Sequence, residues 1–294
     1  MNSKTQIYCF HRVSDEFSPA YPPMPVDVFK KVCNYIDRNY LVIPIEEVKK
    51  DFSSKKMRAV ITFDDAYYDF YENALPILSE LKMPAIQHVI THSADTGESF
   101  WTQQLNKIIE TYYFQKKKLS IPDFNIEVLL NNPAEVKKTA INVYLKLLNL
   151  KDKDKYIKEM ESGLDEKVSF TKMMNWKEIN DCLNYGISIG SHTHTHPTLT
   201  ELSSEQLHFE LQHSKKMILE NTNVENCHSI AYPNGRYNEE VNKIAESCGY
   251  KFLLTTEAKS VEKSEKENLL PRFDLYNNEW WKLRLRLSAY KLLY

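Results

Sequence analysis

Two adjacent carboxylates end an apolar run in the first quarter of the chain. Residues 59–65 read AVITFDD, so Asp64 and Asp65 directly follow the apolar residues. Neighbouring acids at a strand end repel and desolvate each other, so we expect a cation beside them. A metal ion can bind one carboxylate and leave the other as a base. The alternative is that the pair only caps the following helix, because Asp is favoured at helix N-termini.

A group of histidines follows a second apolar run. Residues 186–200 read GISIGSHTHTHPTLT and place His192, His194 and His196 within five residues. The His-x-x-x-His spacing suits one face of a helix, but Pro197 disfavours helical geometry at the residue before it, so we expect a structured loop. Neutral imidazole nitrogens bind zinc. We expect His192 and His196 to be ligands and His194 to point away or to support them; the alternative is surface histidines without a ligand.

Together these two clusters predict a catalytic metal centre. Two histidines and one carboxylate leave a coordination position for water, whereas structural zinc sites are closed and usually contain cysteine. A metal lowers the pKa of its bound water to about 7 and polarises a carbonyl. The aspartate that does not bind the metal can then take the proton of the water.

A third apolar run ends in a turn. Residues 229–237 read SIAYPNGRY, and Pro, Asn and Gly are typical of a tight turn. Backbone N–H groups exposed in such a turn can stabilise a developing oxyanion. The alternative is an ordinary turn before a helix that starts near Asn238.

Short apolar runs alternate with longer amphipathic stretches, which predicts a parallel sheet. Seven or eight such units favour a closed barrel, in which the acids and histidines lie at the carboxyl ends of the strands. The expected strands are residues 6–10, 41–45, 59–63, 85–90, 186–189, 229–232, 251–255 and 269–273. The expected helices are residues 26–38, 68–81, 176–184, 203–220 and 239–247.

Two segments depart from this alternation. Residues from about 97 to 169 show helical periodicity without a clear strand and hold too many apolar residues to stay disordered, which predicts a helical insertion in a single domain of residues 1–294. Residues from about 279 to 294 predict a basic, amphipathic helix. This helix either docks on the barrel, which we favour, or lies on an anionic membrane with Trp280, Trp281, Leu285 and Leu292 inward.

The composition is that of a soluble globular protein. The 294 residues are 42% hydrophobic and 27% charged, and 38 basic against 40 acidic residues give a net charge of −2 and no electrostatic case for a nucleic-acid partner. The N-terminus lacks the apolar core of a secretory signal. The five cysteines form no Cys-x-x-Cys pair, so we expect reduced thiols and a cytoplasmic location, at the inner membrane surface if the tail binds lipid.

The motifs together resemble those of the polysaccharide deacetylases, which are carbohydrate esterase family four or NodB-homology proteins and include chitooligosaccharide deacetylases. The residues that carry the resemblance are TFDDA at 62–66, SHTHTHP at 191–197 and AYPNG at 231–235, with FHRVSD at 10–15 and MNWKEI at 174–179. It covers about residues 5–95 and 170–275. The resemblance implies an α/β fold, a distorted and often seven-stranded (β/α) barrel, with a divalent metal that is commonly zinc.

The resemblance also implies roles for individual residues. Asp64 resembles the general base and Asp65 the carboxylate ligand, whereas His192 and His196 resemble the two histidine ligands. The backbone N–H of Asn234 takes the place of the oxyanion donor. The implied reaction is hydrolysis of an acetyl group from an acetylated sugar or polysaccharide, at an amino sugar or at a sugar hydroxyl. We assign the enzyme to the class that cleaves carbon–nitrogen (amide) bonds, although the sequence does not distinguish N- from O-acetyl groups.

Two departures from the family pattern affect these roles. Ala231 stands where many members have an arginine that pairs with the base, and Arg272 is our candidate for that cation. No histidine follows His228, so the Leu-x-His motif that normally supplies the general acid is absent; His11 is the first candidate to replace it and His92 the second. The missing motif leaves open a catalytically weak or inactive, metal-containing glycan-binding pseudoenzyme. A metal-dependent amidohydrolase for a non-sugar amide is a further alternative, because the motifs define the metal and the attacking water better than they define the substrate.

Overall fold

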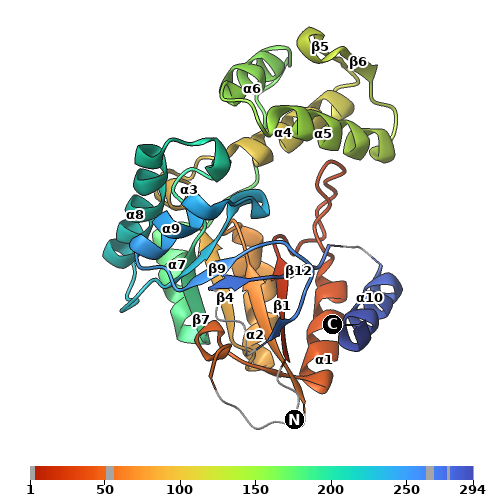
Figure 1. The fold of residues 1–294 in the computed structure, drawn as a ribbon. Helices are drawn as coiled ribbons and strands as arrows, with labels where there is room; N and C mark the ends of the chain where they lie inside the picture. Colours follow the sequence, from red (N-terminus) through yellow and green to blue (C-terminus); the bar gives the residue numbers. More distant parts are fainter. Residues whose placement is uncertain (1–3, 51–55, 263–267, 277–278, 294) are drawn as a thin grey trace. The chain divides into compact units, whose positions relative to one another are not determined.

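A parallel sheet organises the larger part of the chain in the computed structural model, which describes residues 4–50, 56–262, 268–276 and 279–293 (Figure 1). The parallel strands run in the spatial order β1, β3, β4, β7, β8, β9 and β11. Their bounds are Lys4–Phe10 (β1), Met57–Phe63 (β3), Ala85–Val89 (β4), Ile187–Ser191 (β7), Ser229–Ala231 (β8), Phe252–Leu254 (β9) and Leu269–Leu270 (β11). Two short strands join this path: β2 (Tyr40–Val42) pairs with β3, and β10 (Val261–Glu262) pairs antiparallel with β1.

The sheet returns to its first strand at Pro271. On one side of this proline β11 pairs with β9, and on the other side β12 (Phe273–Asp274) pairs in parallel with β1. Proline has no N–H to donate, which accounts for the interruption between the two short strands. The expected α/β barrel is therefore confirmed. The strand count differs slightly from the expected seven, because the path also includes β10 and becomes eight strands long.

Helices surround this sheet in Figure 1. They are α1 (Val26–Asn39), α2 (Leu75–Glu80), α3 (Thr91–Thr96), α7 (Trp176–Cys182), α8 (Ser204–Asn221) and α9 (Glu239–Ser247). Ser203 and Gln206 exchange the two hydrogen bonds of a capping box at the start of α8, as their spacing predicts. The helix expected over residues 68–81 forms over residues 68–80, and it contains a π-helical turn over Phe70–Ala74 before α2.

The register of β1 and β3 fixes the edge at which the acids lie. Phe10 is the partner of Phe63 in the parallel ladder, and their rings stack with centroids 5.2 Å apart. Phe63 also packs edge-to-face on Phe70, with centroids 4.6 Å apart. Because both strands end at this buried aromatic layer, His11 and Asp64 follow at the same edge of the sheet.

Residues 98–172 belong to a second compact unit, together with Glu16–Pro22. Its helices are α4 (Trp101–Phe114), α5 (Pro133–Leu147) and α6 (Lys153–Ser162), which surround an apolar core of their own. Two residues of α4 hold Glu16–Pro22 in this unit. Lys107 forms an ion pair with Glu16, and Glu110 accepts a hydrogen bond from the hydroxyl of Ser18. That the chain is one domain with an insertion stays a prediction.

The expectation that this insertion has no strand is wrong. Residues Lys118–Ile121 (β5) and Ile126–Leu129 (β6) form an antiparallel hairpin. Leu119 and Ile121 are buried while Lys118 and Ser120 are exposed, which is the alternation of a half-buried strand. The run is only four residues long, so the helical periodicity on either side obscured it.

The C-terminal helix α10 (Trp280–Leu293) lies beside α1 (Figure 1). Leu283 and Leu287 are fully buried, so this face docks on the barrel unit. The membrane alternative places Trp280 toward the lipid, but its ring packs against Tyr35 with centroids 6.2 Å apart. Among the described residues, no helix combines the length and apolar character needed to cross a bilayer.

Candidate metal centre

A tight turn after β3 separates the side chains of the two aspartates. The N–H of Asp64 donates to the carbonyl oxygen of Phe10 at 3.0 Å, which extends the ladder by one residue. Asp65 and Ala66 then adopt left-handed backbone angles, with φ of +74° and +62°. Left-handed angles are uncommon without glycine, and Ala66 stands where glycine is frequent in the resembling family. The carbonyl of Ala66 accepts a hydrogen bond from the N–H of Met174 at 2.9 Å, which anchors this turn.

The histidine motif forms a loop, as Pro197 predicts, and a buried carboxylate holds it. Glu210 of α8 accepts hydrogen bonds from the N–H groups of His194 and Thr195 at 2.8 and 2.9 Å, and from the hydroxyl of Thr195 at 2.6 Å. Thr193 and His196 adopt left-handed backbone angles, with φ of +68° and +59°. These bends bring the side chains of His192 and His196 to the same side, with ring centroids 4.8 Å apart.

The structure brings Asp65, His192 and His196 together. Their ligand atoms lie within 4.8 Å of one another, and all three residues are buried. His192 Nε2 lies 3.3 Å and His196 Nε2 lies 3.8 Å from Asp65 Oδ1. Within the described residues this carboxylate oxygen accepts no hydrogen bond, although it is buried. Such an orphaned acceptor facing two imidazoles fits a divalent metal held by one oxygen and two nitrogen ligands.

The hydrogen bond of His192 and the neutral ring of His196 agree with a role as ligands. His192 Nδ1 donates to the carbonyl oxygen of Ala231 at 2.8 Å, so the lone pair of a neutral ring lies on Nε2, toward Asp65. Burial, together with the nearby His192, lowers the pKa of His196 to about 3, which keeps its ring neutral. Burial lowers the pKa of His192 too, but Asp64 and Asp65 oppose it and leave a net increase.

Asp64 lies in a separate network. Arg272 donates from Nη1 to Oδ1 and from Nη2 to Oδ2, both at 2.8 Å, and is only 1% exposed. His88 Nδ1 lies 3.1 Å from Oδ1, and the thiol of Cys9 lies 3.5 Å from Oδ2. Burial raises the pKa of Asp64, but the charges of Arg272 and His192 and these hydrogen bonds outweigh it and hold the pKa well below its usual range.

Arg272 therefore lies where the sequence predicts a cation for Asp64. It occupies the interruption between β11 and β12, and its Nε donates to the carbonyl oxygen of Thr255 at 3.0 Å. The buried guanidinium thus has partners on both sides. Arg272 reaches Asp64 from the last strands of the barrel, whereas Ala231, the residue in the family position, lies on β8.

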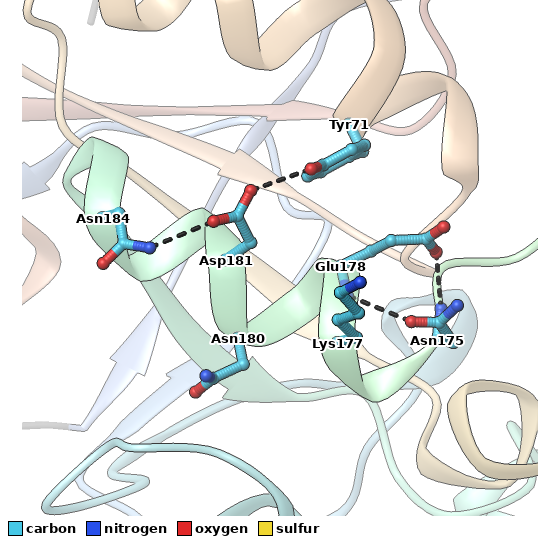
Figure 2. A pocket seen from close by; sticks show the side chains of 7 residues that line it. All are labelled: Tyr71, Asn175, Lys177, Glu178, Asn180, Asp181 and Asn184. Atoms are coloured by element: carbon cyan, nitrogen blue, oxygen red, sulfur yellow. Dashed lines mark hydrogen bonds between the residues drawn. The ribbon is translucent and has the colours of Figure 1, made fainter.

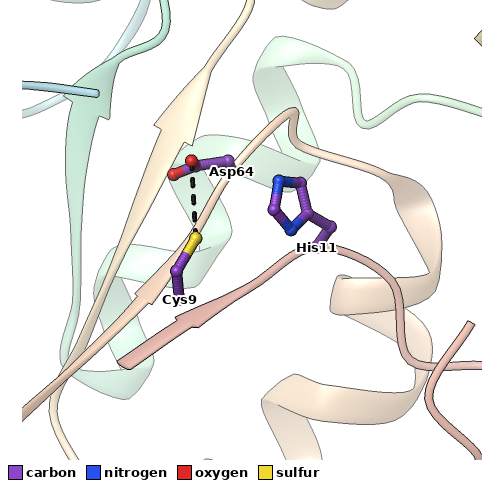
Figure 3. Close-up of side chains that lie close together, drawn as sticks. All are labelled: Cys9, His11 and Asp64. Carbon is purple, nitrogen blue, oxygen red and sulfur yellow. Dashed lines mark hydrogen bonds between the residues drawn. The ribbon is translucent and has the colours of Figure 1, made fainter. Parts of the chain in front are cut away.

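Two further candidates from the sequence are His11 and Asn234. Figure 3 shows His11 beside Asp64 and Cys9, and one ligand atom from each lies within 4.8 Å of the others. Arg272 already donates to both oxygens of Asp64, so this trio is a poor metal site. Asn234 adopts a left-handed φ of +58° in the turn Pro233–Gly235 after β8.

The two other histidines of this edge lie outside the ligand cluster. His194 Nδ1 shares a hydrogen bond with the hydroxyl of Thr91 at 2.9 Å, and its ring lies 4.6 Å from that of His213. His92 packs on His194 with centroids 5.5 Å apart. His194 therefore points away from the ligands, which was one of the two positions expected for it.

Sequence reasoning missed three buried residues of this site: Cys9, His88 and Glu210. Each lies within a strand or helix, whereas the motifs of the sequence follow the ends of strands. The signal available for His88 was the polar pair Gln87–His88 inside the otherwise apolar run of β4.

A hollow of about 560 Å³ beside α7 has a different character (Figure 2). Its lining groups satisfy one another: Asp181 accepts from Tyr71 at 2.8 Å and from Asn184 at 3.0 Å. Asn175 and Glu178 form the capping box of α7. Helix capping and packing thus account for these polar groups, and none belongs to the two clusters above.

Comparison with known proteins identifies the family. The sequence profile described as polysaccharide deacetylase matches residues 51–253. The chain belongs to this family, as its motifs predict. One curated relative, named "Putative polysaccharide deacetylase YxkH", from Bacillus subtilis (strain 168), is 41% identical over 81 residues. That match covers 28% of this chain and 29% of the relative.

Solved structures with the same fold are more distant in sequence. The Streptococcus pyogenes deacetylase PplD, in complex with acetate, has a TM-score of 0.65 and 21% identity and covers 97% of this chain and 98% of its own. A polysaccharide deacetylase from Bacillus cereus, BC0361, has a TM-score of 0.65 and 16% identity, covering 98% and 69%. IcaB from Ammonifex degensii has a TM-score of 0.63 and 14% identity, covering 97% of both chains.

Proposed function

We propose that this protein is a metal-dependent hydrolase that removes acetyl groups from an acetylated saccharide by cleaving the amide bond. The observation that carries the proposal is the pair of adjacent aspartates. Asp65 lies with two imidazoles and has an unused buried oxygen, whereas Asp64 is held ionised beside it. Membership of the polysaccharide deacetylase family supports an acetylated saccharide as substrate.

Asp65, His192 and His196 are the residues that would hold the metal. The set of one carboxylate and two imidazoles suits zinc, which we propose as the ion. A divalent ion in this position supplies Lewis-acid polarisation of the acetyl carbonyl and makes water more acidic. The hydrogen bond from His192 to the carbonyl of Ala231 orients this ligand for the purpose.

The remaining residues would move protons and stabilise charge. Asp64 would accept the proton of the attacking water, and Arg272 would keep this carboxylate ionised beforehand. The backbone N–H of Asn234 would donate to the oxyanion that develops at the carbonyl oxygen of the acetyl group. His11 would donate a proton to the leaving nitrogen; in support, its ring lies beside Asp64 (Figure 3).

The test compares acetate release by the wild-type protein with that of Asp64→Asn and His11→Ala, all loaded with zinc. The substrates are N-acetylchitopentaose and O-acetylated xylan oligosaccharides. We expect a loss of about 100-fold or more for each variant, the size of a general acid–base contribution, with zinc still bound. Undiminished turnover by zinc-loaded Asp64→Asn would eliminate Asp64 as the base. A zinc-loaded wild type that binds these saccharides and releases no acetate would instead favour the glycan-binding alternative.

We also propose that α10 makes a peripheral contact with an anionic membrane at its cytoplasmic face. Trp281, Leu285 and Leu292 are 58%, 65% and 84% exposed on this helix. Basic residues flank them, which favours an anionic surface; these are Lys282, Arg284, Arg286 and Lys291. The five cysteines are free, as in proteins of reducing compartments, which supports a cytoplasmic location.

Vesicles containing phosphatidylglycerol test this contact without removing the helix. We expect Trp281→Ser/Leu285→Ser to sediment less with these vesicles than the wild type does. Leu219→Ser, at another exposed leucine on α8, serves as the control and should bind as the wild type does. Equal sedimentation of all three proteins would refute the proposal.

A further inference from the structure

His88 belongs to a hydrogen-bond chain that none of these roles uses. It lies on β4 with no exposed surface. Its Nδ1 lies 3.1 Å from Asp64 Oδ1, and its Nε2 lies 2.8 Å from the hydroxyl oxygen of Ser229 on β8. Buried polar side chains are nearly always hydrogen-bonded, and here both ring nitrogens are satisfied.

The ionised state of Asp64 sets the direction of both hydrogen bonds. Arg272 keeps the carboxylate charged, and a carboxylate can only accept, so Nδ1 of His88 must carry the proton. A neutral ring then has its lone pair on Nε2, to which the hydroxyl of Ser229 donates. Burial lowers the pKa of His88, against the opposing effect of Asp64, which favours this neutral ring.

Gly190 provides the space for the imidazole. It lies on β7 and is the register partner of His88 in the parallel ladder. A Cβ at this position would come within 2.5 Å of Cδ2 and 2.9 Å of Nε2 of the ring. A larger residue would displace the ring, so glycine is required here for close approach. Gly190 on β7, Ser229 on β8 and Asp64 after β3 thus hold the ring in place.

This arrangement makes the two oxygens of Asp64 different. An ionised carboxylate offers about four lone-pair positions. Oδ1 accepts from both Arg272 and His88, whereas Oδ2 accepts from Arg272 and, among the described residues, has the thiol of Cys9 at 3.5 Å as its one other contact. A thiol is a weak donor. The proton is therefore most easily taken up at Oδ2.

We propose that His88 is a positioning residue, which fixes the carboxylate of Asp64 so that Oδ2 presents a lone pair to the attacking water. Arg272 donates one hydrogen bond to each oxygen and so does not distinguish them. The ring of His88 donates to Oδ1 alone, which makes the two oxygens inequivalent. The proposal rests on the proposed function, because it gives a geometric role to the base of that reaction.

Two substitutions at this position separate positioning from packing. In His88→Asn, the side-chain amide nitrogen takes the place of Nδ1 and can still donate to Asp64. His88→Leu has a similar volume and no donor. For N-acetylchitopentaose with zinc-loaded protein, we expect His88→Leu to lower kcat by about 10- to 100-fold, the effect of losing a hydrogen bond to a charged group. KM should stay within about twofold, and His88→Asn should recover about tenfold of the loss.

Gly190→Ala tests the same geometry from the neighbouring strand. In the wild-type background it should lower kcat about as much as His88→Leu does, because the new Cβ displaces the ring. In the His88→Asn background it should cost less, because the ring atoms it would meet are gone. Ser188→Ala, on the same strand, is the control and should leave kcat unchanged. Equal losses for His88→Asn and His88→Leu, or full kcat in His88→Leu, would refute the proposal.

A spectroscopic measurement does not depend on turnover. Nitrogen-15 NMR of the histidines in the wild-type protein, assigned by comparison with His88→Asn, should show the Nδ1–H tautomer for His88. An Nε2–H tautomer or a protonated ring at neutral pH would overturn the proposal. If the wild type released no acetate from any saccharide while His88 showed the Nδ1–H tautomer, the proposed function would fail and the hydrogen-bond assignment would stand.

Discussion

Asp64 and Asp65 are neighbours in the chain, yet the fold surrounds them in opposite ways. Asp64 accepts hydrogen bonds from a guanidinium, an imidazole and a thiol, all supplied by the chain. Asp65 faces two imidazoles, and one of its buried oxygens accepts no hydrogen bond from the described residues. The turn at Asp65, with φ of +74°, directs the two side chains into these separate surroundings.

The comparison shows how one pair of acids can acquire two kinds of chemistry. The protein itself supplies the cation for Asp64, so this carboxylate stays ionised. The surroundings of Asp65 suit a cation taken from solution, because neutral imidazoles offer lone pairs and no positive charge. Two carboxylates with distinct environments can serve as base and as ligand in the same site.

Exchanging each acid for its amide should separate the two roles. We expect Asp65→Asn to lower acetate release by more than about 1,000-fold, beyond the 10- to 100-fold typical of residues that only support a ligand. This variant should also lose bound zinc, whereas Asp64→Asn should retain it. Zinc content by mass spectrometry of the native proteins, together with acetate release, checks the pair. Equal zinc content in both variants would contradict the assignment of Asp65 as a ligand.

Removing the cation of Asp64 should destabilise the fold. Arg272→Met leaves a buried carboxylate without its cation, which costs about 3–5 kcal/mol of unfolding free energy. The double variant Arg272→Met/Asp64→Asn should recover part of this loss, because no buried charge remains.

Urea unfolding measures both effects. The control is Lys243→Met, which removes an exposed ion pair with Glu239 and should cost at most about 1 kcal/mol. A cost for Arg272→Met no larger than that of this control would contradict the importance of the buried pair.

Removal of the metal should act through the cluster of Asp65, His192 and His196 and not through the hydrogen bonds of Asp64. A chelator should abolish acetate release and lower the melting temperature, and added zinc should restore both. At a free zinc concentration of about 100 Kd, binding stabilises the native state by about 2.7 kcal/mol. Thermal melts of wild type and Asp65→Asn provide the measurement. A zinc-dependent rise in the melting temperature of Asp65→Asn as large as in wild type would place the metal elsewhere.

The smallest effect is expected at the loop between the two histidine ligands. Glu210→Gln keeps the shape but replaces a charged acceptor for three hydrogen bonds by a neutral one. We expect a loss of about 1–3 kcal/mol of stability and about tenfold in zinc affinity. Glu205→Gln, exposed on the same helix, is the control. Calorimetric zinc titrations that give equal affinities for both variants would show that the loop does not depend on this carboxylate.

The larger part of the fold was predictable because its signals are local. Apolar runs, capping residues and turn residues fix the ends of most strands and helices, as the capping box of Ser203 and Gln206 illustrates. The convergence of Asp65 with His192 and His196 was predictable for a related reason. Each motif follows a strand, and the carboxyl ends of parallel strands meet at one edge of a barrel. The roles of these residues stay predictions.

The rest depends on contacts between strands that no local pattern reveals. His88 and Gly190 matter to each other because β4 and β7 pair in one register, and a shift of one residue would turn the ring to the other face. The hairpin of β5 and β6 was missed because four alternating residues carry little signal between two long helices.

Because Pro271 separates β11 from β12, burial of the charged pair of Asp64 and Arg272 depends on the pairing of β12 with β1. Arg272 lies 208 residues after Asp64 in the chain, and it reaches the acid only when Phe273 and Asp274 pair with β1. Before β12 pairs with β1, a partly assembled barrel must keep Asp64 in contact with water, because burying a carboxylate without its cation is costly. Pairing of β12 with β1 and desolvation of Asp64 are therefore coupled.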